Sequence, residues 1–258
     1  MSINEVFPNP TVKQVIFQIR FPNLFYIENK IGDFQVEIMK EFPESALIIQ
    51  KQFVIVDIGS KTKLDDISSD LDKETGKIWQ FKSKKDFQLN VLGNSLDISS
   101  QYHKTYNLEG GHKFRDIIMF VLERFFKFAS IPIINRIGLR YIDECPIPSK
   151  NNKKFKSYYN STFPLKRFNL ADANEMNFNT TIKKDKYYLR YIESLKKVGN
   201  EQHKLILDFD GFAENISSKD YLKVTDKLHA IISKEFEKTI KEPVYKYMKK
   251  KRRRWKWI

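Results

Sequence analysis

The order of two hydrophobic periodicities along the chain constrains its fold more than any other feature of the sequence. Apolar and polar residues alternate, as in half-buried strands, in residues 12–21, 46–58, 78–82, 87–92, 96–101, 133–143, 176–183, 187–196 and 203–212. Apolar residues recur every three or four positions, as on one face of a helix, in residues 25–42, 112–129 and 219–240. Strands therefore follow one another in groups between the helices, which predicts an antiparallel α+β fold and argues against a doubly wound parallel sheet.

The same pattern sets the expected domain organisation. We expect residues 1–242 to form a single α+β domain, with an antiparallel meander sheet and three long helices packed mainly on one face. Groups of strands follow the first two helices, so two similar halves, residues 1–109 and 110–242, are an open alternative, although no residue-level repeat is visible. Pro243 follows the last predicted helix, and we expect residues 243–258 to form a separate, mobile tail.

Positive charge is concentrated in this tail. The formal net charge of the chain is +14, and residues 241–258 contain nine basic residues and one acid. The candidate nucleic-acid-binding residues of the tail are Lys249, Lys250, Lys251, Arg252, Arg253, Arg254, Trp255, Lys256 and Trp257. Basic side chains neutralise phosphates and release counterions, and aromatic rings stack on bases. The alternatives are an anionic membrane surface, a solvated tail without a ligand, and a docking strand with both tryptophans on one face.

Several enzyme classes have no support in the sequence. A single cysteine excludes a disulfide framework and a cysteine-only metal site. The glycine-rich nucleotide-binding motifs, the nucleophile elbow and the zinc-protease motif are all absent. We therefore expect no cofactor, no catalytic residues and a protein that is more readily a binder than an enzyme. Cys145 follows two acids, which do not activate a thiol, and we interpret it as structural.

A second basic group lies on predicted strands. Arg136 and Arg140 share one face of the strand 133–143, and Arg190 lies on the strand 187–196. Such a sheet face could contact phosphates or stack on bases. The alternative is that these arginines form ion pairs with acids on neighbouring strands.

The best-placed acids are Asp208 and Asp210, which lie two residues apart on a strand and therefore face the same side. With a third acid, Glu193 or Asp143, they could hold Mg²⁺. The alternative, which we favour, is a strand face in water or in ion pairs with the arginines. We therefore expect no metal site. Asp226 and His229, one turn apart on the last predicted helix, could form a general base, but we expect this pair to be exposed.

Several motifs resemble one family of proteins. They are Pro8-Asn9-Pro10, Ile19-Arg20-Phe21-Pro22, Trp79-Gln80-Phe81-Lys82-Ser83, Leu92-Gly93-Asn94-Ser95-Leu96, Tyr102 with Tyr106, the strand from Arg136 to Ile142 (RIGLRYI), and His203 to Asp210. Over residues 6–240 the chain resembles a sporadically distributed, functionally uncharacterised prokaryotic family of about this length. The resemblance implies a horizontally transferred gene of the kind found in mobile or defence loci, and no catalytic residue is carried over. The family commonly has Asn where this chain has Asp143, and residues 241–258 lie outside the resemblance.

These observations predict a non-enzymatic nucleic-acid-binding or accessory subunit of a prokaryotic defence or mobile-element system. Its expected partners are DNA or RNA, a protein of the same locus, or both. The alternatives are a protein-interaction module that docks through a sheet edge or the tail, and a metal-dependent nuclease using Asp208 and Asp210.

The sequence also bears on location. Residues 1–10 lack the apolar stretch of a signal peptide. The longest apolar run, Ile117–Leu122, is far shorter than the roughly 20 residues that span a bilayer. We therefore expect a cytoplasmic protein without a transmembrane segment.

Overall fold

The computed structural model describes residues 5–51, 75–149, 151–198 and 202–250. Its main element is one antiparallel sheet of nine strands in the order β2-β3-β4-β5-β1-β6-β9-β8-β7. The strands are β1 (Val12–Arg20), β2 (Glu44–Lys51), β3 (Thr75–Lys82), β4 (Phe87–Val91), β5 (Ser95–Ser100), β6 (Ile133–Cys145), β7 (Glu175–Lys184), β8 (Tyr187–Val198) and β9 (Gln202–Ser217). The predicted antiparallel α+β fold is therefore confirmed, in a single sheet.

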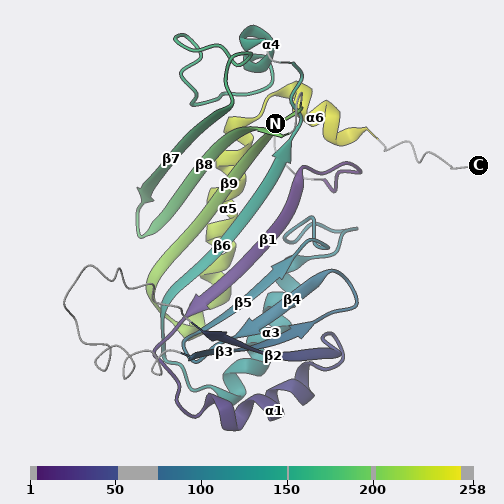
Figure 1. The fold of residues 1–258 in the computed structure, drawn as a ribbon. Coiled ribbons are helices and arrows are strands. Elements are labelled where there is room, and N and C mark those ends of the chain that lie inside the picture. The colour runs from purple at the N-terminus through teal and green to yellow at the C-terminus, as the bar shows by residue number, and fades with distance from the viewer. Residues whose placement is uncertain (1–4, 52–74, 150, 199–201, 251–258) are drawn as a thin grey trace, which may run out of the picture.

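Five α-helices occur in the described parts of the chain: α1 (Ile27–Ile38), α3 (Phe114–Phe128), α4 (Asn152–Lys156), α5 (Tyr221–Thr239) and α6 (Glu242–Lys249). A 3₁₀ turn, Ser218–Asp220, leads into α5. Helices α1, α3 and α5 lie behind the sheet in Figure 1, on one side of it. Helix α5 packs on β6, β8 and β9, and α1 packs on α3. No helix among the described residues is long and apolar enough to cross a membrane.

The alternation of residues along each strand separates the two faces of the sheet. In β1, Val15, Phe17 and Ile19 have no exposed surface, whereas the residues between them are half-buried on the opposite face. The buried residues of all the strands form one core with the helices. In this core the ring of Phe125 on α3 lies 5.4 Å from Phe34 on α1 and 5.7 Å from Phe21, measured between ring centroids.

The expectation of a separate tail from residue 243 onward is wrong for its first residues. Residues 242–249 form helix α6, in which Val244, Tyr245 and Met248 are buried. The backbone N–H of Asn9 donates to the carbonyl of Met248 at 3.0 Å, so α6 is held against the N-terminal segment. Pro243 does not end the chain's helical structure but occupies the first turn of α6, where a helix tolerates proline because no backbone N–H is needed.

Two strands differ in length from the prediction. Strand β3 begins at Thr75, three residues before the predicted segment 78–82. The last predicted strand continues beyond residue 212 to Ser217. The strand predicted over residues 46–58 is described to residue 51, and residues 52–58 lie outside the described residues. Helix α4, capped at its first turn by the Asn151 side chain, lies where the periodicities predicted neither a strand nor a helix.

We expect Phe125→Ala to lower the free energy of unfolding by about 3–5 kcal/mol, because it removes a fully buried ring that contacts two others. Chemical denaturation measures the change. Phe25→Ala is the matched control, since Phe25 is 90% exposed, and it should change the stability by less than about 0.5 kcal/mol. Equal effects of the two substitutions would contradict this assignment of the core.

Candidate functional site

The face of the sheet opposite α1, α3 and α5 carries a band of polar side chains. None of the helices in the described segments lies in front of the strands there (Figure 1). Strand alternation and register place these amide and hydroxyl side chains on the face: Gln14, Gln18, Gln80, Gln88, Asn90, Ser99, Asn177, Asn179 and Thr181. We call this surface the open face. Part of it is hollow, with a depression of about 310 Å³ lined by residues of β1, β3, β4 and β5 and their connections.

The predicted arginines of β6 lie on the open face and form ion pairs. Arg140 binds Asp208 in a bidentate manner, with Nε to Oδ1 at 2.8 Å and Nη2 to Oδ2 at 2.6 Å. Arg136 donates from Nη2 to Asp210 Oδ2 at 2.8 Å. Burial raises the pKa of Asp210 although both arginines lower it. The charges of the two arginines and the two aspartates are therefore paired with one another.

Arg190 is different from the other two arginines. It is exposed on β8, and its Nε donates to Asn179 Oδ1 at 3.4 Å. No described carboxylate lies within ion-pair distance of it. A neighbouring pair of rings, Tyr188 and Phe212, stacks with centroids 5.0 Å apart at 13°, and the Arg136 guanidinium lies 4.6 Å from the Phe212 centroid. The open face thus offers Arg190, which has no acidic partner among the described residues, beside stacked aromatic rings. Arg20 on β1, which donates to Gln18, has no acidic partner there either.

The structure does not assemble the metal site that the sequence allowed. Glu193 and Asp143, the proposed third acids, lie on the helix-covered face, opposite Asp208 and Asp210. Glu193 is buried and accepts hydrogen bonds from Ser161 and Thr162, which anchors the segment between α4 and β7. No cluster of three potential metal ligands occurs in the parts of the chain that are described.

Most of the basic tail lies outside the described residues. Lys249 ends α6 and forms an ion pair with Glu5 at 2.7 Å. Lys250 follows as the C-cap of α6. The other candidate residues, Lys251, Arg252, Arg253, Arg254, Trp255, Lys256 and Trp257, are not among those the structure describes.

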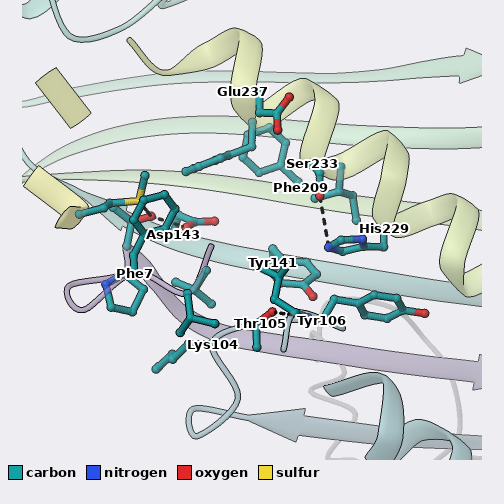
Figure 2. Close-up of a pocket in the computed structure, with 18 of the residues that line it drawn as sticks. Phe7, Lys104, Thr105, Tyr106, Tyr141, Asp143, Phe209, His229, Ser233 and Glu237 are labelled. Atoms are coloured by element: carbon teal, nitrogen blue, oxygen red, sulfur yellow. Dashed lines mark hydrogen bonds between the residues drawn. The ribbon is translucent and has the colours of Figure 1, made fainter. Parts of the chain in front are cut away.

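A cavity of about 340 Å³ lies on the helix-covered side of the sheet, between the sheet and α5 (Figure 2). It is bounded by α5, by β6 and β9, by residues 5–12, by residues 104–108 and by Met248 of α6. The sequence analysis did not find this site. One residue in the sequence does point to it. Asp143 follows Leu139 and Tyr141 on the inward face of β6, and an acid is rare at a buried position.

Three polar groups of this cavity have unusual environments. Thr11 Oγ1 donates to Asp143 Oδ1 at 2.7 Å, and burial raises the pKa of Asp143 to about 7. The buried hydroxyl of Tyr141 has no hydrogen-bond partner among the described residues. Burial lowers the pKa of His229 to about 4, and His229 Nε2 lies 3.2 Å from Ser233 Oγ. At neutral pH the histidine is uncharged and the aspartate is only partly ionised.

Asp226 and His229, which we expected to be an exposed pair, are both half-buried and bind different partners. Asp226 accepts from the Tyr106 hydroxyl at 2.6 Å and from Arg115. His229 instead stacks on the Tyr106 ring, with centroids 4.3 Å apart, and faces the cavity (Figure 2). Cys145 is buried, and this burial raises its thiol pKa, as expected for an unreactive cysteine.

Comparison with known proteins adds no assignment. No protein-family model matches the chain, and a search of curated proteins finds no match.

We expect Asp143→Asn to stabilise the protein increasingly as the pH rises from about 4 to about 7. The folded state holds the Asp143 proton with a pKa of about 7, against 3.8 for the ordinary carboxyl. The acid form therefore favours folding at low pH, and this contribution is lost as the pH rises through the folded pKa. Asparagine does not ionise and escapes the loss, which amounts to at most about 4 kcal/mol at ~1.4 kcal/mol per pKa unit.

Urea unfolding of wild type and variant at several pH values measures this difference. Asp86→Asn, at an exposed turn residue, is the control and should show no such trend. A stability difference for Asp143→Asn that is the same at all pH values would contradict the raised pKa.

Proposed function

We propose that this chain is a non-enzymatic nucleic-acid-binding accessory protein that contacts DNA or RNA with the open face and with residues 250–258. The observation that carries the proposal is the one-sided arrangement of the sheet, whose uncovered face presents amides, arginines and aromatic rings. Such groups hydrogen-bond phosphates and bases and stack on bases. Sheets are known to bind nucleic acid through a face or a ribbon of strands.

The charge distribution supports a division of roles. Because Arg136 and Arg140 are each paired with an aspartate, they add little net positive potential to the open face. Electrostatic affinity would come mainly from Arg20 and Arg190 and from residues 250–258, which contain six basic residues and no acid. The open face would position the nucleic acid, and the basic residues would supply the salt-dependent binding energy.

The same contacts favour binding over cleavage. Asp208 and Asp210, the acids best placed for a metal-dependent nuclease, each accept from an arginine, and the two other candidate acids lie on the opposite face. The proposed place of the protein, a subunit of a prokaryotic defence or mobile-element system, rests only on the family resemblance of residues 6–240.

The connectivity supports a two-part origin of the sheet. Strands β1 and β6 are neighbours at its centre, and each pairs on its other side with the last strand of its own group, β5 or β9. A helix follows each of these last strands, α3 after β5 and α5 after β9. We therefore also propose two similar halves, with the boundary after α3 instead of at residue 110. A nucleic acid could then run across the central β1–β6 pair and contact both halves.

Binding of labelled single- and double-stranded DNA and RNA over a salt series tests the proposed function. Deleting residues 250–258 should lower affinity at least about tenfold and flatten the salt dependence, since each lost phosphate contact removes ~0.9 from the slope on duplex DNA. Arg190→Ala should weaken binding several-fold. Arg167→Ala is its matched control, because Arg167 is exposed on the segment between α4 and β7. Equal affinity after the deletion, or equal effects of the two arginine variants, would contradict the proposal.

An exposed apolar edge favours a second function, docking on a partner protein. Strand β2 ends the sheet order, and on it Leu47 is 54% and Ile49 57% exposed. Val36 on α1 and its C-cap residue Met39 are exposed as well, and α1 is joined to β2 by a hydrogen bond from Gln35 to Ser45. Exposed apolar residues on an edge strand are a site for strand addition or side-chain packing.

Coexpression with the protein encoded by the adjacent gene tests this second function. If β2 is the docking edge, the two proteins should copurify after nuclease treatment and at about 0.5 M salt, where exposed charges are screened. Ile49→Lys should abolish copurification. Ile133→Lys, at another exposed isoleucine, should leave copurification intact. Loss of copurification with both variants, or with neither, would contradict the assignment of the docking edge to β2.

A further inference from the structure

The cavity under the helix-covered face has the character of a small-molecule site. Its volume of about 340 Å³ is at the small end of the range for such sites, roughly 300–1,000 Å³. Its apolar wall is formed mainly by Phe7, Val12, Phe209, Ile232, Phe236 and Met248. The rings of Phe209 and Phe236 meet edge to face, with centroids 6.0 Å apart. A flat, aromatic body of modest size fits this wall.

Polar groups line the cavity from several elements, and two of them, Asp143 and Tyr141, lie on β6. Asp143 Oδ1 accepts from Thr11, and no described residue donates to its Oδ2. Tyr141, two residues earlier on the same face of the strand, has a buried hydroxyl without a partner in the described part of the chain. Leaving a buried polar group without a hydrogen bond costs free energy, which a ligand that bonds to this group would recover. Figure 2 shows Tyr141 between Asp143 and His229, so these groups face one ligand-sized space.

The charges around the cavity select between classes of ligand. Its charged lining residues are the acids Glu5, Asp143 and Glu237 and one base, Lys104, whose Nζ donates to the carbonyl of Lys13. No arginine lines the cavity. Phosphates and carboxylates are bound by arginine clusters or by several donors together, so an anionic ligand is disfavoured. A ligand that carries a protonated amine or N–H donors would pair with Asp143.

We propose that this cavity binds a small aromatic or heteroaromatic amine. The ring would lie among Phe7, Phe209 and Phe236, and the amino group would donate to the Asp143 carboxylate. The site is separated from the open face by the sheet itself, because Asp143 and Tyr141 lie on the opposite side of β6 from Arg136 and Arg140. The proposal therefore does not depend on nucleic-acid binding.

Titration of the full-length protein with paired probes tests this proposal. The amines are benzylamine and tryptamine, and their anionic counterparts are phenylacetate and indole-3-acetate. Calorimetry and NMR of the methyl groups of Ile232 and Met248, which line the cavity, report binding and its place. Asp143→Asn keeps the shape of the site and removes its charge. Asp97→Asn, at a half-buried acid on the open face that is bonded to Asn90, is the matched control.

We expect at least one amine to bind with a Kd below about 1 mM and to shift both methyl signals. Its carboxylate counterpart should bind at least tenfold more weakly. Asp143→Asn should weaken amine binding at least tenfold, and Asp97→Asn should leave it unchanged. Failure of both amines to saturate, equal binding of amine and carboxylate, or wild-type affinity in Asp143→Asn would each overturn the proposal.

Discussion

The pairing of β1 with β6 at the centre of the sheet is the interaction on which the rest of the structure depends. It joins residue 12 to residue 143 and residue 20 to residue 136, so it links the two groups of strands into one sheet. Because side chains alternate with a period of two, a slip of one residue would exchange the two faces of β6. Asp143 and Tyr141 would then face solvent, and Arg136 and Arg140 would enter the core. Both candidate sites therefore depend on this one register.

The two sites also differ in their physical basis although they share β6. On the open face, charges are exposed or paired, and salt screens interactions with a ligand. In the cavity, burial shifts the pKa values of Asp143 and His229 in opposite directions, toward the neutral forms of both groups. Recognition there depends on hydrogen bonding and apolar contact more than on long-range charge. The two sides are not electrostatically independent, because Asp208 on the open face also raises the pKa of Asp143.

Local patterns predicted the strands well, and the reason is visible in particular residues. The inward positions 15, 17 and 19 of β1 are Val, Phe and Ile, and positions 205, 207 and 209 of β9 are Leu, Leu and Phe, so the period of two is clear there. The ion pairs of the β6 arginines with Asp208 and Asp210 were among the alternatives that the alternation allowed. Which arginine pairs with which aspartate follows only from the strand order and register. Pro243 was misinterpreted because proline follows one helix and begins another with the same local signal.

The cavity could be predicted only in part for a related reason. The inward position of Asp143 follows from the alternation on β6. The raised pKa of Asp143 cannot be inferred from the strand pattern, because the residues that surround Asp143 include Thr11 and Met248, which are far apart in the sequence.

The contact between the first and last described segments has a consequence for how the protein is made. The Asn9 backbone and side chain donate to the carbonyls of Met248 and Tyr247. On the ribosome, β1 is synthesised early, yet its partner β6 and the helix α6 that binds the Asn9 segment appear much later. During translation the central strand must wait with one edge unpaired, and such edges promote aggregation. The contact between Asn9 and α6 can form only after residues 247 and 248 have been synthesised.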